Sequence, residues 1–537
     1  SGAVNIATYT DDYDTDIRQG NPGYPGTSTG TAPDIGADEF DVTVDHYGPE
    51  ISYTAISSTT CGATTRTFTA TVTDYSGVNV TAGTLPRVYY KKLTNANVLG
   101  GTNTNTTDGW KYTEATFLGG SSFSFTIDYT LVFGGVAAGD NIQYFVTAQD
   151  LFTPVNVGIN SGSFAANPAS VSLTGAAFPL GGTINSYNIV LPIPTLVTIG
   201  AAGTYPSLTG AGGLFADLNT KGLSGNTVVN IIDLTVNETG ANSLNQMVYG
   251  CAGPNTLTIK PNAAGTTLTG SLASAALLKI KSSNVIIDGS SNGTSSQDLT
   301  ITNLSVTAPS VVLIGSTVTT AVTNTTLKNC FVINGVNTAT AVVVGDGTTL
   351  GTAGYFNNIN LQNNNIQRAY NGIFAVAVPF AGNGSGLNIT GNAINTSGAN
   401  AIRLVGVYVQ GVDGATVSGN DIGNFETISG EVDRGIWFAT STTNSVIEKN
   451  NIHDLQYTGV GGYGAKGISV STGLAAANIT IKNNMISGIT GDGDSYASFG
   501  ALYCPVGIYA FGAGQGGINI YYHSIYLTGS TLNVAAT

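Results

Sequence analysis

The sequence contains very little charge. Lys and Arg number 17 and Asp and Glu 31 among 537 residues, so charged residues make up 9% and the net charge is −14. A chain so poor in cations has no basic patch to recognise nucleic acid or an anionic membrane surface. Its surface must be built mainly from Thr, Ser, Asn and Gly, which suits extracellular and saline conditions. We therefore expect an extracellular, cell-surface protein with no nucleic-acid partner.

Long apolar runs are also missing. No stretch of 18 apolar residues occurs, so direct membrane insertion is not expected. Neither an initiating Met nor a signal peptide opens the sequence, which we interpret as an internal piece of a longer polypeptide.

The residues that usually carry catalysis or bind cofactors are scarce. The sequence has no nucleophile elbow, phosphate loop or dinucleotide fingerprint, so its many glycines are interpreted as turn residues. Neither the cysteines nor the histidines have metal-ligand spacing, and the cysteines allow three complete pairings or isolated buried thiols. These residues are Cys61, Cys251, Cys330, Cys504, His46, His453 and His523. No catalytic residue and no organic cofactor are predicted.

A repeated phrase dominates the second half of the chain. An aliphatic residue is followed by two variable residues and then by an asparagine. A second aliphatic residue comes two positions after the asparagine. The asparagines are 28, 28, 30 and 34 residues apart, a spacing typical of solenoids. They are Asn364, Asn392, Asn420, Asn450 and Asn484. We expect each to lie at a bend, where asparagine tolerates left-handed backbone angles, and to stack on the next as a structural ladder.

A second phrase follows each asparagine. It reads Asn371-Gly372-Ile373-Phe374, Ala401-Ile402-Arg403-Leu404, Arg434-Gly435-Ile436-Trp437, Lys466-Gly467-Ile468-Ser469 and Val506-Gly507-Ile508-Tyr509. Both phrases are short, β-branched and alternating, without helical spacing, so they predict strands. The fold class predicted is all-β, with a right-handed parallel β-helix.

The rest of the chain divides into further segments. Alternating strands with polar turns over residues 42–190 predict an antiparallel β-sandwich. The prolines of residues 191–194 predict a stiff linker. Residues 195–537 form the β-helix, with a capping helix between Pro206 and Leu223, and with the solenoid interrupted rather than capped at Thr537.

Two segments resemble known families. Residues 139–150 resemble the late strand of immunoglobulin-like or fibronectin type III-like modules. Ala32-Pro33-Asp34-Ile35-Gly36-Ala37-Asp38-Glu39-Phe40 resembles the phrase that closes parallel β-helix domains in secreted proteins of Bacteroidota, so residues 1–41 would be the end of a preceding β-helix. Together with the ladder, the whole chain resembles the repeat unit of giant surface adhesins of that phylum, which are associated with gliding motility and exported by the type IX route.

This resemblance implies a structural and adhesive repeat of a very large surface protein or filament. Neighbouring repeats of the same polypeptide, and surface glycans, would be its partners. Two alternatives remain at this stage: a β-helix polysaccharide lyase or hydrolase, and a carbohydrate-binding or fibre-forming module.

Longer polar loops before the second phrase offer candidate carbohydrate-binding residues. They are Glu431, Asp433, Arg434, Trp437, Tyr463 and Lys466. Arg434 and Lys466 occupy one column and should lie about 5 Å apart. The columns carry no repeated carboxylate of the kind that an active groove needs. We therefore interpret the patch either as a glycan-facing surface or as polar insertions whose stacked charges of opposite sign neutralise each other.

An acidic run near the start of the sequence is the single metal candidate. Its carboxylates are those of Asp11, Asp12, Asp14 and Asp16. Alternate carboxylates can converge on one calcium ion, but the glycine and distal glutamate of an EF-hand are absent. At most a weak structural calcium site is expected.

Overall fold

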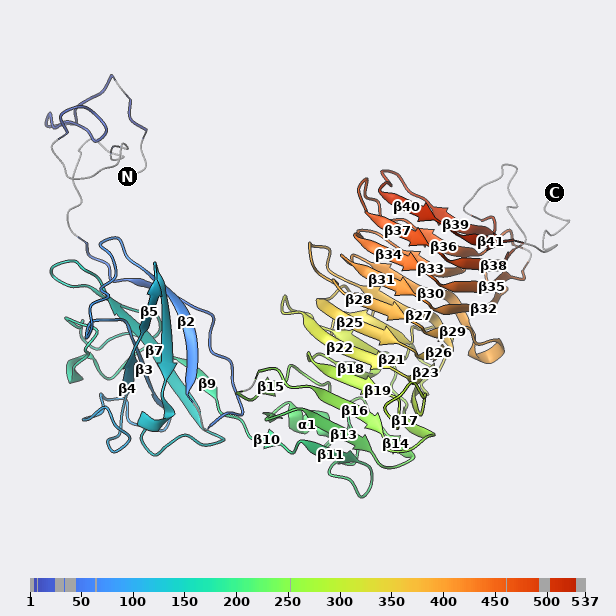
Figure 1. Cartoon of the computed structure of the whole chain (residues 1–537), viewed down its shortest axis with the longest axis horizontal. Helices are drawn as coiled ribbons and strands as arrows, with labels where there is room; N and C mark the ends of the chain where they lie inside the picture. Colours follow the sequence, from blue (N-terminus) through green and yellow to red (C-terminus); the bar gives the residue numbers. More distant parts are fainter. Residues whose placement is uncertain are drawn as a thin grey trace. The chain divides into compact units, whose positions relative to one another are not determined.

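The computed structural model describes residues 4–6, 8–24, 33, 45–62, 65–251, 253–459, 461–491 and 503–527. The phrase at residues 32–40 lies outside these residues except for Pro33. Internal contacts divide the chain into two units, Ser1–Ser57 with Gly62–Ile189 and Ser58–Cys61 with Val190–Thr537. The regular elements of both units are almost all strands, which confirms the all-β class (Figure 1).

The first unit contains two antiparallel sheets over one core. One sheet has the order β1-β2-β6-β5, and the other has β4-β3-β7-β8 with β9 also paired to β7. Phe123 and Phe125 of the first sheet and Tyr144 and Val146 of the second share a buried cluster. Alternation explains this arrangement, since every second residue of β6 is buried. The elements are β1 (Glu50–Ser52), β2 (Arg66–Thr73), β3 (Arg87–Lys92), β4 (Lys111–Glu114), β5 (Thr116–Gly119), β6 (Ser122–Ile127), β7 (Asn141–Gln149), β8 (Val157–Ile159), β9 (Asn185–Asn188) and the 3-10 helices η1 (Tyr129–Leu131) and η2 (Gly175–Ala177).

The second unit is a parallel β-helix whose rungs contribute strands to three long sheets. In Figure 1 its rungs progress from α1 and β11 at one end to β40 and β41 at the other. The first sheet contains β11 (Leu196–Ile199), β13 (Thr227–Ile231), β16 (Leu257–Pro261), β19 (Val285–Asp288), β22 (Val322–Lys328), β25 (Phe356–Gln362), β28 (Leu387–Thr390), β31 (Ala415–Ser418), β34 (Ser445–Glu448), β37 (Ile479–Lys482) and β40 (Ile518–Tyr521). The second contains β14 (Thr235–Asn237), β17 (Thr266–Gly270), β20 (Leu299–Asn303), β23 (Cys330–Asn334), β26 (Asn365–Gln367), β29 (Ala393–Ile394), β32 (Asp421–Thr427), β35 (Asn451–Tyr457), β38 (Met485–Thr490) and β41 (Ser524–Tyr526). The third contains β18 (Ala276–Ile280), β21 (Ser310–Gly315), β24 (Val342–Gly345), β27 (Ala369–Val376), β30 (Ile402–Gln410), β33 (Arg434–Phe438), β36 (Lys466–Val470) and β39 (Val506–Ala510).

Parallel register stacks like residues along the core. Leu361, Ile389, Val417 and Ile447 follow one another in register on the first sheet, and all are fully buried. Each inward column is therefore a continuous aliphatic row, which buries apolar surface at every rung.

One expected alignment was wrong: Ile373 pairs with Val407, so the second phrase of that rung is Val405-Gly406-Val407-Tyr408 and not 401–404.

The asparagines form a buried ladder. The Oδ1 atom of Asn420 accepts the N–H and the Nδ2 of Asn392, each at 2.9 Å. Its own N–H and Nδ2 donate to Asn450 Oδ1, at 3.0 and 2.9 Å, and Nδ2 also donates to the Ile389 carbonyl at 2.8 Å. Only 1% of Asn420 is exposed, so these polar groups depend entirely on one another.

Other residues continue the ladder beyond the asparagines. His523 Nδ1 lies 3.3 Å from the Asn484 N–H and Nε2 lies 3.1 Å from the Ile481 carbonyl. With Nδ1 accepting and Nε2 donating, the imidazole reproduces the acceptor and donor of an asparagine amide. At the other end of the ladder, the N–H of Cys330 donates to Asn364 Oδ1 at 3.1 Å.

The bend differs from the expectation in one respect. The left-handed residue is the one before each ladder position, with φ between 51° and 66° along the column. The ladder residue contributes the hydrogen-bonding side chain, and the residue before it adopts the left-handed conformation that turns the backbone. That preceding residue is Asn329, Asn363, Gly391, Gly419, Lys449, Asn483 or Tyr522. Asn and Gly adopt this conformation readily, whereas Lys449 and Tyr522 are held there by the stacking of the rungs.

The start of the β-helix is closed by a short helix and a disulfide. Helix α1 (Leu214–Leu218) buries Leu214, Phe215 and Leu218 against the first rungs. Pro192 and Ile193, in the segment expected to be a linker, form β10 (Pro192–Ile193), which pairs with β12 (Gly222–Leu223), itself paired with β15 (Val248–Tyr249). Cys61 and Cys251 form a disulfide with their Cα atoms 5.4 Å apart, while Cys330 and Cys504 are free and buried.

The described helices are all too short to cross a lipid bilayer.

Candidate functional site

An aromatic column runs along the outer face of the third sheet. Phe374, Tyr408 and Trp437 follow one another in register on β27, β30 and β33. The Phe374 and Tyr408 rings are stacked with centroids 4.6 Å apart, and Tyr408 meets Trp437 edge to face at 5.0 Å. All three are half-buried. Sequence reasoning found Trp437 and missed its two neighbours, because the register of β30 was assigned incorrectly.

The two cations of the predicted patch lie beside this column and are buried. Arg434 and Lys466 are partners in register. The guanidinium of Arg434 lies 4.0 Å from the Trp437 ring centre, and the Lys466 amine lies 5.4 Å from that of Tyr509 and donates to the Cys504 carbonyl. Lys466 is completely buried, and burial together with the charge of Arg434 lowers its pKa to about 8. Their charges are thus directed towards protein groups.

The two carboxylates differ from each other. Glu431 accepts two hydrogen bonds of 3.0 Å from Arg403 and lies 3.3 Å from the Tyr370 hydroxyl. Asp433 is 1% exposed, and neither of its oxygens has a hydrogen-bond partner among the described residues. Burial, reinforced by the charge of Glu431, raises the pKa of Asp433 well above its usual value. Tyr463 packs edge to face against Tyr457 and Tyr503.

Asp433 should make stability fall as pH rises. Its raised pKa means that the folded chain holds a proton that the unfolded chain releases above about pH 4, so unfolding becomes more favourable as the pH increases between the two pKa values. Asp433→Asn should therefore raise the melting temperature at pH 7 and leave it nearly unchanged at pH 3.5. Differential scanning calorimetry at both pH values checks this. Glu426→Gln, at an exposed carboxylate on β32, is the control. A loss of stability at pH 7 would show that Asp433 is ionised and paired.

The predicted calcium residues converge in part. Carboxylate oxygens of Asp12, Asp14 and Asp16 lie within 4.8 Å of one another, and Asp12 accepts the Asp16 N–H at 2.8 Å. Asp11 instead forms a backbone bridge with Ile17. The three clustered residues are the ones that could hold a cation.

A second acidic cluster escaped the sequence analysis. Asp45, Asp74 and Asp150 meet at one end of the sandwich with oxygens within 4.8 Å. Asp74 and Asp150 directly follow β2 and β7, so each lies at the end of a strand. Ser76 donates to both Asp45 and Asp74, at 2.6 and 2.8 Å, and Asn156 donates twice to Asp150, so protein donors already serve all three carboxylates.

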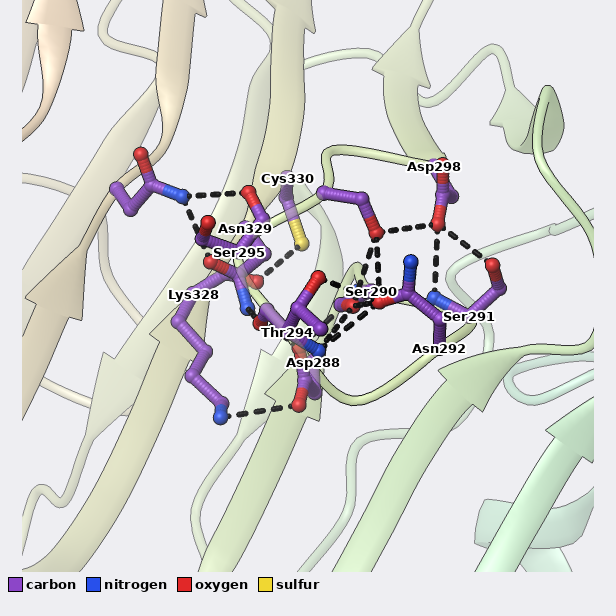
Figure 2. A network of polar contacts seen from close by, with 12 residues as sticks. Asp288, Ser290, Ser291, Asn292, Thr294, Ser295, Asp298, Lys328, Asn329 and Cys330 are labelled. Carbon is purple, nitrogen blue, oxygen red and sulfur yellow. Dashed lines mark hydrogen bonds and ion pairs between the residues drawn. The ribbon is translucent and has the colours of Figure 1, made fainter.

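Hydroxyl groups gather in the loop between β19 and β20 (Figure 2). Ser291 and Ser296 donate to Asp298 at 2.6 and 2.7 Å. No imidazole accompanies them in the network of Figure 2. The carboxylate that accepts from them is that of Asp298, and the hydrogen bond from Ser291 lowers its pKa, which makes it a weak general base. Burial raises the pKa of the nearby Cys330 thiol, which disfavours the reactive thiolate. The network organises a loop.

His453 has neighbours that resemble those of a catalytic histidine, namely carboxylates and a serine. Its Nε2 lies 3.2 Å from Asp421 and its Nδ1 lies 2.9 Å from Asp454. Ser487 is its partner in register on β38. Because carboxylates engage both ring nitrogens, neither nitrogen is available to activate the Ser487 hydroxyl.

Comparisons with known proteins add the following. No protein-family model and no curated protein matches the chain. Among solved structures, the A-module of the mannuronan C-5 epimerase AlgE4 from Azotobacter vinelandii is similar, with 12% sequence identity and a TM-score of 0.31 over 57% of this chain and 90% of that chain. This likeness is too distant to carry an argument about activity.

Proposed function

We propose that the chain is a structural and adhesive module of a very large extracellular surface protein. The observation that carries this proposal is the buried asparagine ladder. Each asparagine donates to the next one along the ladder, from Asn364 to Asn484, so successive rungs are locked at one register. A solenoid fixed in this way serves as a stiff spacer.

The disulfide supports the same role. Cys61 and Cys251 are separated by 190 positions. A pull transmitted through residues 58–61 reaches the β-helix across this bond without extending the chain between the two cysteines. Such a cross-link is stable in oxidising surroundings, as outside the cell.

The resemblance to gliding-associated adhesins of Bacteroidota gives the proposal its context. In that setting type IX export would deliver the module to the cell surface, and its partners would be neighbouring repeats of the same polypeptide and surface glycans. The net charge of −14 argues against nucleic acid as a partner.

A β-helix polysaccharide lyase or hydrolase is the second candidate. Lys466 favours it, because an amine with a pKa near 8 beside Arg434 could act as a base towards an acidic sugar. Its complete burial keeps it from a polymer, and the ion pair with Arg403 occupies Glu431. The structural role therefore fits the geometry better.

Assays of glycan breakdown distinguish the two candidates. The purified chain is expected to release no products from pectin, alginate or neutral glycans, since the buried groups cannot contact a substrate. Reducing ends and the ultraviolet absorbance of unsaturated uronates would be measured. Turnover that disappears in Asp433→Asn or Arg434→Ala, but persists in Glu426→Gln, would establish the enzyme instead.

Antibody labelling tests the proposed location. Gold-labelled antibodies raised against the chain should decorate intact producing cells, because a surface module is reachable without permeabilisation. An antibody against a cytoplasmic protein serves as the control and should label only permeabilised cells. Labelling of the chain that also requires permeabilisation would contradict the proposal.

A further inference from the structure

Unequal turns create a recess where the third sheet leads into the first. The turn between β27 and β28 covers residues 377–386, and that between β36 and β37 covers 471–478. Between them, the turns of the two intervening rungs are shorter, at 411–414 and 439–444. The long turns form the walls and the short turns form the floor of a recess of about 410 Å³. Its shape is therefore set by the lengths of four successive turns.

One wall presents an aromatic platform. Phe380 lines the recess and is 54% exposed, so its ring is accessible to a ligand. Its ring is tilted against that of Tyr355, with centroids 6.0 Å apart. Leu474, on the opposite wall, is partly buried. The recess thus offers an apolar surface to one face of a ligand.

The floor presents polar groups fixed by hydrogen bonds. Asp413 accepts the Gly382 N–H at 2.7 Å, Asn444 Nδ2 at 2.6 Å and the Thr443 hydroxyl at 3.1 Å. The hydrogen bond from the Asn444 amide, and to a smaller extent that from the Gly382 N–H, lowers the pKa of Asp413 below its usual value. The Asp413 carboxylate is therefore an ionised acceptor at neutral pH. A carboxylate has about four acceptor positions, and these three donors leave room for another. Ser441 also lines the floor.

We propose that this recess binds a neutral sugar ring of a glycan. The apolar face of the ring would lie on Phe380, and its hydroxyl groups would donate to Asp413 and exchange hydrogen bonds with Ser441 and Thr443. An apolar wall combined with a few fixed polar groups is the usual composition of a small-ligand site. The lining residues include Asp413 but no Lys, Arg or His. The charge of Asp413 therefore disfavours uronates and other anionic sugars.

The proposal assigns a ligand beyond the structural role and stands independently of it. The recess is also separate from Glu431, Asp433, Arg434, Trp437, Tyr463 and Lys466, none of which lines it. Surface labelling tests the location of the module, and sugar binding tests this recess, so either proposal can fail alone.

Binding to the full, oxidised chain would be measured by saturation-transfer NMR and calorimetry. The probes are glucose, galactose, mannose, N-acetylglucosamine and their β-linked tetrasaccharides, with tetragalacturonate as the acidic comparison. At least one neutral probe should bind, and Phe380→Ala should weaken that binding about tenfold through loss of the stacking surface. Phe380→Trp should retain it, and Asp413→Asn should weaken it.

Phe117→Ala is the matched control, because Phe117 is an exposed phenylalanine on β5, 42% accessible, in the other unit. Melting temperatures of all variants would verify folding. The proposal is overturned if no neutral probe binds, if Phe380→Ala binds as tightly as Phe117→Ala, or if tetragalacturonate binds as well as the best neutral probe.

Discussion

Replacing Asn420 by leucine is expected to lower the free energy of unfolding by about 3 kcal/mol. Leucine has the same number and branching of side-chain heavy atoms as asparagine, so it leaves no cavity and the effect comes mainly from lost hydrogen bonds. The N–H and Nδ2 of Asn392 lose their acceptor, and the Ile389 carbonyl loses a donor. Because this column is buried, water cannot replace the missing partners.

Two measurements check this expectation. Urea denaturation followed by circular dichroism gives the change in stability, and hydrogen exchange of the peptide around Asn392 reports whether its N–H becomes unprotected. Asn451→Ala is the matched control, since Asn451 is the next residue in sequence, is exposed, and bonds to Asp421 at 2.7 Å. If Asn420→Leu costs no more than Asn451→Ala, the ladder does not stabilise the β-helix.

Periodicity made the ladder and the parallel β-helix predictable. Each ladder asparagine recurs in phase with aliphatic residues before and after it, so one alignment places both the buried rows and the polar column. The pairing of Arg434 with Lys466 followed from the same alignment. The repeat predicts these positions because equivalent residues of successive rungs occupy equivalent places in the structure.

The burial of the candidate site was not predictable in the same way. On a regular strand Arg434 and Trp437, three positions apart, would face opposite sides of the sheet. In the structure a Cβ on Gly435 would point to Ile452 in the core, and Ile436 is also in the core, so two successive positions face inward. Arg434 can therefore reach the Trp437 ring on the outer face. The sequence does not reveal this break in alternation, since glycine has no side chain to mark a direction.

The acidic cluster of the sandwich was missed for a different reason. Asp45, Asp74 and Asp150 come from widely separated segments that meet at one end of two sheets. Their convergence depends on the pairing order of those sheets, and no repeat exposes that order.

The column of glycines in the third sheet underlies the last prediction, which concerns Gly435→Ala. Its members are Gly372, Gly406, Gly435, Gly467 and Gly507. A Cβ on Gly435 would lie 2.7 Å from the Gly467 carbonyl oxygen and 2.7 Å from Cγ2 of Ile452. The carbonyl belongs to a neighbouring rung and cannot withdraw without disturbing the pairing of β33 with β36. We expect a loss of about 3 kcal/mol, at the upper end for an overpacked core.

A glycine under no such constraint would behave in the opposite way. Alanine in place of glycine restricts the unfolded chain and usually stabilises a protein by about 0.4 to 1 kcal/mol. Gly175 in η2 provides the matched control, since an added Cβ there meets nothing within 4 Å. Melting temperatures should therefore move apart, downward for Gly435→Ala and level or upward for Gly175→Ala. Equal shifts of the two melting temperatures would mean that the rungs can separate to admit a methyl group. Close packing against the core would then not be the reason for glycine in this column.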